Sequence, residues 1–206
     1  MSAFLGPIHY WLYNKVLWHE ALLEDIYAEM KNTEAVASLK NNLEVRYGLP
    51  ETSELSDVID AGNIHGWLQE KIHSLEYRMA GAITEGLSKE WLSVEGLAML
   101  YRSNGEKAAL STSKPMTTPQ ELFGVIYDYL LEGMPCDRVN QPIESTEISL
   151  TWIKRTCLHT EFWEAVGGDI AIYNHLRAAW LEGFVDESFE LQMQDASTYT
   201  LTRRVA

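Results

Sequence analysis

A stretch near the start of the chain recurs farther along, and this repetition constrains the fold more than any other feature. Residues 6–16 read GPIHYWLYNKV and residues 62–72 read GNIHGWLQEKI, an offset of 56 positions. The identical pairs are Gly6 and Gly62, Ile8 and Ile64, His9 and His65, Trp11 and Trp67, Leu12 and Leu68, Lys15 and Lys71, and, farther on, Glu20 and Glu76. Because chance rarely repeats a tryptophan and a histidine together, the two stretches indicate an internal duplication.

The repeated stretch has the spacing of an amphipathic helix. At about 100° per residue, Ile8, Leu12 and Val16 form one apolar stripe that His19 continues, and this stripe is expected to face the core. Pro7 suits the first helical turn, where its missing N–H costs nothing. Two related helices are therefore predicted.

Capping and turn signals divide the rest of the chain. The predicted helices cover residues 6–30, 33–47, 62–83, 88–102, 118–131, 145–166 and 170–182. Thr118-Pro119-Gln120-Glu121 is a capping box with proline at the first helical position. Asn104-Gly105 marks the strongest predicted loop, over residues 103–116. The tail alternates apolar and polar residues from Phe189 and again from Tyr199, which is typical of a short β-hairpin.

Together these elements predict an all-α or nearly all-α fold in a single domain, residues 1–206. Two duplicated helical hairpins, residues 6–47 and 62–102, are expected to pack as a helical bundle. A C-terminal helical part with three helices, residues 118–183, would complete it. The tail, residues 184–206, would add the β-hairpin.

The composition of the chain limits the classes of partner and the cellular location that can be expected. Apolar residues make up 46% of the chain, which is enough for a substantial core, and the formal net charge is −14. An acidic surface repels phosphates and anionic lipid, so neither nucleic acid nor a membrane is an expected partner. No apolar run reaches the length of a membrane span, no secretory signal begins the chain, and two cysteines make no disulfide framework. The sequence therefore predicts a cytoplasmic protein.

The duplicated residues form the first candidate site. A ligand pocket between the repeats would be lined by His9, Trp11, Glu20, His65, Trp67 and Glu76. His9 and Glu20 are separated by about 16 Å of helical rise, so one helix cannot bring both to one ligand. Parallel packing of the two copies would bring the histidines together, whereas antiparallel packing would place each histidine opposite the other copy's glutamate.

Three interpretations of this site remain open. His9, His65, Glu20 and Glu76 could hold a non-haem metal ion, since bundles draw such ligands from several helices. The Glu-x-x-His motif of di-iron bundles is absent, however. The same residues could line a small-molecule pocket, or they could only form hydrogen bonds between helices, where a carboxylate fixes a histidine tautomer.

Two weaker candidate sites follow. Cys136 lies in an irregular loop whose backbone N–H groups can activate a thiol, and Cys157 and His159 are two positions apart on a predicted helix. No trusted zinc pattern results from these three residues. A polar pocket is the other candidate, lined by Asn174, His175 and Arg177 and closed from the tail by Asp195, Tyr199, Arg203 and Arg204.

The function predicted from the sequence is binding of a small ligand or a metal at the repeats. If the protein is an enzyme, His9 or His65 would act as general base. The alternatives are a non-catalytic assembly protein that forms a homodimer through its aromatic residues, and a thiol redox protein that uses Cys136. Glycine-rich phosphate loops, the Gly-x-Ser-x-Gly elbow and His-Glu-x-x-His are absent from the sequence.

Overall fold

The computed structural model describes residues 5–31 and 33–204, without the side chain of Thr33. The chain divides into two compact units. We call them unit 1, Met1–Gly96 with His159–Ile170, and unit 2, Leu97–Leu158 with Ala171–Ala206. Each unit combines two separate pieces of the chain. The expected single domain and internal repeat stay predictions.

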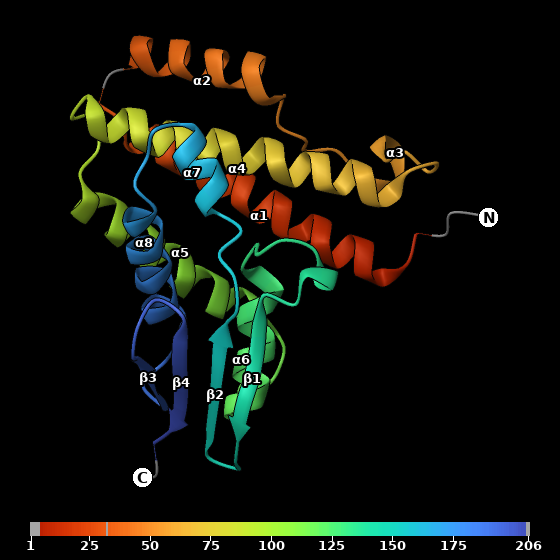
Figure 1. Ribbon diagram of the computed structural model, residues 1–206, viewed down its shortest axis with the longest axis vertical. Helices are drawn as coiled ribbons and strands as arrows, with labels where there is room; N and C mark the ends of the chain where they lie inside the picture. Colours follow the sequence, from red (N-terminus) through yellow and green to blue (C-terminus); the bar gives the residue numbers. More distant parts are fainter. Residues whose placement is uncertain (1–4, 32, 205–206) are drawn as a thin grey trace. The chain divides into compact units, whose positions relative to one another are not determined.

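Unit 1 is built on two long helices that run in the same direction. Its elements are α1 (Pro7–Glu29), α2 (Thr33–Tyr47), α3 (Leu55–Val58), α4 (Ile64–Ser88) and the short α7 (Thr160–Ala165). His9 contacts His65 near the starts of α1 and α4, and Glu20 pairs with Arg78 farther along both, so the two helices are parallel (Figure 1). Their shared core includes Leu12, Val16, Leu23, Leu68, Ile72 and Leu75.

The second helix, α2, packs on α4 and runs against it. The ring of Tyr47 stacks on that of Tyr77 at 4.8 Å between centroids, and a Cβ added to Gly81 would meet Leu43. The predicted bundle of paired hairpins is wrong, because α4 packs on both α1 and α2, whereas residues 97–102, the end of the predicted 62–102 hairpin, belong to unit 2. Leu12 and Val16 are buried as predicted, whereas Ile8 is 49% exposed.

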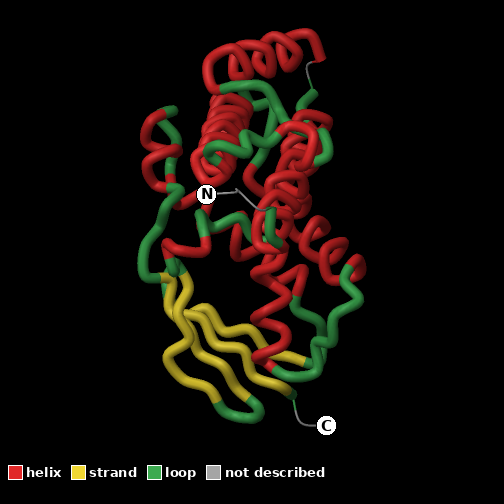
Figure 2. Tube along the Cα trace, turned by 90° about the vertical axis from the view of Figure 1, so that its right-hand side faces the viewer, coloured by secondary structure: helices red, strands yellow, loops and turns green. Residues whose placement is uncertain are grey.

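Unit 2 contains a four-stranded antiparallel sheet in the order β1-β2-β4-β3 (Figure 2). The strands are β1 (Asn140–Ser145), β2 (Ser149–Lys154), β3 (Phe189–Met193) and β4 (Thr198–Arg203); the helices are α5 (Val94–Ser111), α6 (Pro119–Tyr129), the 3-10 turn η1 (Pro135–Asp137) and α8 (Ile170–Phe184). Trp152 stands opposite Tyr199 and Leu150 opposite Leu201. Helix α6 contacts β2 and β4.

The sheet overturns the prediction of an all-α fold. The fold is mixed helix and sheet with helix predominant, and the helix predicted over 145–166 is replaced by β2, an irregular segment and α7. Within Ser149–Lys154, Leu150, Trp152 and Lys154 are buried while Thr151 and Ile153 are half-buried, a period of two. Threonine, tryptophan and isoleucine also favour strands. The tail hairpin is present, but it forms half of this larger sheet.

The predicted loop at Asn104-Gly105 is also wrong, because both residues lie inside α5. Asn104 accepts a hydrogen bond from Trp180 Nε1 at 2.9 Å. A Cβ on Gly105 would stand 2.2 Å from the Trp180 carbonyl oxygen, and one on Gly183 would stand 2.1 Å from that of Arg102. The glycines therefore serve a backbone-to-backbone approach of α5 and α8, and they do not mark turns.

Several predicted boundaries are confirmed. Helix α1 follows Gly6-Pro7 and ends at Glu29, and α2 covers Thr33–Tyr47. Thr118 caps α6 by accepting from the Glu121 N–H. Helix α4 starts at Ile64 rather than Gly62, since Asn63 caps it by accepting from the Gly66 N–H.

Candidate functional site

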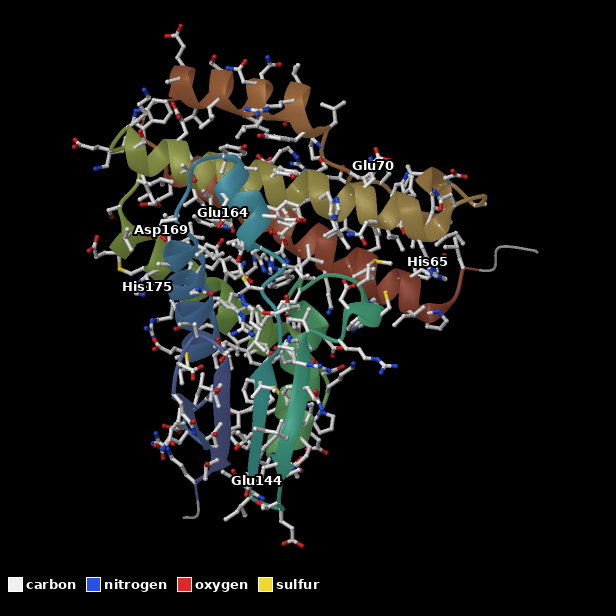
Figure 3. The ribbon with its side chains drawn as sticks, viewed as in Figure 1. His65, Glu70, Glu144, Glu164, Asp169 and His175 are labelled. Carbon is white, nitrogen blue, oxygen red and sulfur yellow. The ribbon has the colours of Figure 1, made fainter. Side chains whose placement is uncertain are left out.

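The duplicated histidines meet at the start of α1 and α4. The two Nε2 atoms of His9 and His65 lie 3.3 Å apart, and the rings are tilted by 48°. Figure 3 labels His65 at the N-terminal end of α4, where it is exposed. This is the arrangement expected for parallel copies.

The backbone at Gly6 assigns the tautomers of this histidine pair. The Gly6 N–H donates to Nδ1 of His9 at 3.0 Å, so the ring proton of neutral His9 is on Nε2. That Nε2–H then donates to Nε2 of His65. A metal-bound histidine usually donates its second ring N–H to an acceptor, whereas His9 Nδ1 is itself an acceptor. The geometry therefore supports a hydrogen-bonded histidine pair.

The glutamates of the repeat lie with other partners. Glu20 is buried and accepts from Nη1 of Arg78 at 2.9 Å and from its Nη2, a bidentate pair between α1 and α4. Glu76 is buried against Nε2 of His159 at 3.3 Å. The four proposed metal ligands thus do not converge, and in the described part of the chain no group of three His, Cys, Asp or Glu could hold a metal ion.

The matched tryptophans carry the same local contact in both copies. Lys15 Nζ lies 3.5 Å from the ring centroid of Trp11, and Lys71 Nζ lies 5.2 Å from that of Trp67. The two copies therefore share a cation–π contact between matched residues. The ring of Trp67 also contacts Tyr13, whose hydroxyl donates to the Ser53 carbonyl.

A histidine outside the predicted pocket joins the Glu76 pair. His19 Nδ1 donates to the Lys15 carbonyl at 3.0 Å. Burial lowers the pKa of His19, although the Lys15 carbonyl and the nearby Glu76 act in the opposite direction. His19 of α1, Glu76 of α4 and His159 at the start of α7 thus form a polar cluster in unit 1, in which Glu76 and His159 are buried and His19 is half-buried.

The three residues of the predicted cysteine site are divided between the two units. Cys136 is exposed on η1 and Cys157 is half-buried after β2; both are free thiols. His159 belongs to unit 1, where it pairs with Glu76. The structure therefore gives no Cys–Cys–His constellation within one unit.

A second group of polar side chains lies on the covered face of the sheet in unit 2. Trp152 and Lys154 alternate onto this face from β2, and Tyr199 lies opposite Trp152 on β4. The Trp152 and Tyr199 rings stack with centroids 5.2 Å apart. Arg177 of α8 lies over Tyr199, with its guanidinium carbon 4.8 Å from the ring centroid. Arg177 and Tyr199, both named for the predicted polar pocket, are thus in contact, while His175 is exposed on α8 (Figure 3).

Arg177 is held by a buried carboxylate. Its Nε donates to Oε1 of Glu132 at 2.5 Å, and both side chains are almost fully buried. Asn140, at the start of β1, donates from Nδ2 to Oε2 of the same glutamate. Burial alone would lower the pKa of Arg177, but Glu132 and the neighbouring tyrosines raise it well above its ordinary value. Arg177 is therefore a permanent cation.

Tyr127 of α6 connects the arginine to the sheet. Its hydroxyl oxygen accepts from Trp152 Nε1 at 3.0 Å and from Arg177 Nη2 at 3.1 Å. Burial of the hydroxyl, with Glu132 nearby, raises the pKa of Tyr127, so the phenol keeps its proton. With the oxygen accepting two hydrogen bonds, the protonated hydroxyl still has one O–H that can donate.

Lys154 supplies a second cation. It is 6% exposed, and its Nζ lies 5.0 Å from the ring centroid of Tyr173 on α8. Across the described residues, three buried atoms here have no hydrogen-bond partner: Lys154 Nζ, Arg177 Nη1 and Asn140 Oδ1. We call Lys154, Arg177, Tyr127, Asn140 and Glu132 the cationic site.

Most of the cationic site was outside the sequence predictions, which named only Arg177 and the adjacent Tyr199. The period-two alternation in Ser149–Lys154 was the available signal, because it places Lys154 on the same face as Leu150 and Trp152. Glu132 and Asn140 gave no comparable signal. They flank an irregular segment, and only the fold brings them onto Arg177.

Comparison with protein-family models, with curated proteins and with solved structures finds nothing that matches this chain. Within residues 5–31 and 33–204, no helix is long and apolar enough to cross a membrane.

Proposed function

We propose that this protein binds a small anion at the cationic site of unit 2. The observation that carries the proposal is Lys154, a buried ammonium whose Nζ has no hydrogen-bond acceptor among the described residues. Taking one such ion out of water costs several kcal/mol, roughly, even after the protein relaxes. A ligand that carries negative charge would offset that cost.

The contacts already present do not balance this charge. The cation–π contact with Tyr173 contributes about 0.5–2 kcal/mol, less than the desolvation penalty. Glu132 is engaged by Arg177 and Asn140. A buried water molecule could accept hydrogen bonds from Lys154 or Arg177, but it would leave the positive charge in place. An anion satisfies both the hydrogen bonds and the charge.

The donors are suited to an oxyanion. Lys154 Nζ of β2 and Arg177 Nη1 of α8 are two buried donors without a partner among the described residues. The Tyr127 hydroxyl of α6, which bonds the same guanidinium, adds a neutral O–H. Charge-assisted hydrogen bonds to carboxylate or phosphate oxygens are about twice as strong as neutral ones. Carboxylates and phosphates are therefore the ligands that this donor set would hold best.

Entry to the cationic site requires a local movement, because its unpartnered atoms are closed to solvent. The segment 133–139 joins Glu132 to Asn140, and its residues 135–138 are exposed. Gly133 and Arg138 both have positive φ, at 72° and 48°. We propose this segment as the part that opens, since its backbone is irregular and both ends carry residues of the cationic site.

The test is thermal unfolding of the full chain in a zwitterionic buffer, with sodium formate, acetate or phosphate added stepwise. A specific ligand raises Tm as its concentration passes Kd. Lys154→Met should remove this dependence, and Lys89→Met, at an exposed lysine of unit 1, should keep it. General salt effects act equally on all three proteins. Equal anion responses in wild type and Lys154→Met would refute the proposal.

The other functions expected from the sequence remain proposals with their own tests. A homodimer should keep twice the chain mass in light scattering at low concentration. Each of the seven tryptophans is buried or half-buried, so an interface of exposed tryptophans has no support. Redox sensing has Cys136 as an accessible thiol, and it fails if that thiol proves unreactive in the native protein.

A further inference from the structure

The ligand of the cationic site must satisfy an acceptor as well as donors. Asn140 donates from Nδ2 to Glu132, and a carboxylate can only accept, so the amide orientation is fixed. Its Oδ1 therefore points away from Glu132 as an acceptor. That oxygen is buried, and no donor among the described residues reaches it.

This acceptor is adjacent to the cationic donors. Arg177 Nε bonds Oε1 of Glu132 while Asn140 Nδ2 bonds Oε2, so the guanidinium and the amide flank one carboxylate. Asn140 also stands directly opposite Lys154 across β1 and β2. A ligand that meets Lys154 and Arg177 with an oxyanion would therefore need a hydrogen-bond donor on a neighbouring atom.

The charges of the cationic site distinguish among anions. Lys154 and Arg177 are cations and Glu132 is an anion, so these three side chains together carry one positive charge. A monocarboxylate balances that charge, whereas a phosphate dianion would leave a negative charge buried. An ammonium as the ligand's donor would add a cation beside Lys154, so a neutral hydroxyl is the better match.

We infer that the cationic site takes a small 2-hydroxy monocarboxylic acid. Its carboxylate would accept from Lys154 and Arg177, and its hydroxyl would donate to Asn140 Oδ1. This inference rests on the proposed anion-binding function and adds the ligand class to it.

The test is calorimetric titration of the full chain with glycolate, acetate and inorganic phosphate in turn. Glycolate and acetate carry the same charge and differ only in the hydroxyl. Because a buried acceptor left unsatisfied is costly, glycolate should bind about tenfold or more tightly than acetate. Phosphate should bind more weakly than glycolate.

A variant of Asn140 tests whether its Oδ1 causes the preference for glycolate over acetate. Asn140→Leu should bind glycolate and acetate equally, while continuing to bind acetate. If that variant does not fold, the wild-type ratio of glycolate to acetate affinities decides alone. Equal affinities in wild type, or tighter binding of phosphate, would overturn the ligand class and leave anion binding standing. No binding of any of the three would overturn both.

Discussion

Lys154 occupies a position in β2 where the alternation of buried and half-buried residues predicts an apolar side chain. Leu150 and Trp152 share its face and are buried with it. A lysine at such a position normally extends its ammonium to water, but Lys154 is 6% exposed. An uncompensated buried charge lowers stability, and binding sites commonly accept such a cost. Lys154 is therefore expected to lower the stability of the ligand-free protein and to favour anion binding.

Lys154→Met should stabilise the ligand-free protein by about 1–3 kcal/mol, because an apolar side chain of similar volume replaces an unbalanced ion. The measurement is urea unfolding in a zwitterionic buffer without small anions. Lys89→Met, which alters an exposed lysine, should change the free energy of unfolding by less than about 0.5 kcal/mol. A loss of stability in Lys154→Met would mean that the ammonium is already balanced.

Glu132 has the opposite role, since it holds Arg177 in the interior. Glu132→Gln should destabilise the protein by about 3–5 kcal/mol, because it leaves the guanidinium without its counter-charge. Glu182→Gln is the matched control: it breaks the exposed pair with Arg102 and should cost less than about 1 kcal/mol. Similar losses in the two variants, measured by urea unfolding, would contradict the burial assigned to the Glu132 pair.

His19 should make stability depend on pH. Burial lowers its pKa in the folded protein below the ordinary value of 6.5, so the unfolded chain binds the proton more readily. Its contribution to stability is therefore complete above pH 6.5 and is lost as the pH falls through that value toward the folded-state pKa.

Urea unfolding of wild type and His19→Gln at several pH values checks this. The variant should lose less stability than wild type on acidification, while His175→Gln, at an exposed histidine, should follow wild type. Parallel curves for wild type and His19→Gln would show that other groups carry the pH dependence.

At the scale of elements, two helical glycines of unit 2 have different roles. Gly105 lies where α5 packs closely on α8, whereas Gly124 lies on an open face of α6 and affects only helix propensity. Gly105→Ala should destabilise by about 1–3 kcal/mol, because its Cβ would collide with the Trp180 carbonyl across α5 and α8. Gly124→Ala, on the open side of α6, should stabilise by about 0.5–1 kcal/mol. Changes of the same sign in both variants, measured by urea unfolding, would contradict the packing of α5 on α8.

The sequence predicted the elements whose signals are local. Thr118 with Glu121 located the start of α6, and Gly6-Pro7 located that of α1. The strands β1 and β2 were missed for physical reasons. Most of β1 is exposed, with Pro142 at an edge where proline is tolerated, and β2 lies between plausible helix signals at Ser145 and Gly167-Gly168.

The candidate sites were likewise predictable only where the signal lay within the repeat itself. The repeat indicated that His9 and His65 could meet, because identical residues at matching helix positions lie together when the helices are parallel. It gave no indication that Glu20 would pair with Arg78 and Glu76 with His159, since those partners lie outside the repeat. The cationic site depends on the sheet, and a prediction without the sheet could not assemble it.

At the scale of the whole molecule, the charge of the chain and that of the cationic site have opposite signs. The formal net charge is −14, so the long-range field opposes the approach of an anion. Affinity must then come from the buried donors, where water does not weaken the interaction.

The most direct measurement is anomalous diffraction from crystals of the full chain equilibrated with sodium bromide. Bromide is a small monovalent anion whose position can be seen. An anomalous peak is expected within hydrogen-bond distance of Lys154 Nζ and Arg177 Nη1, and it should be absent from Lys154→Met crystals. Bromide found only at exposed side chains, with none beside Lys154, would contradict the claim that these buried cations form an anion site.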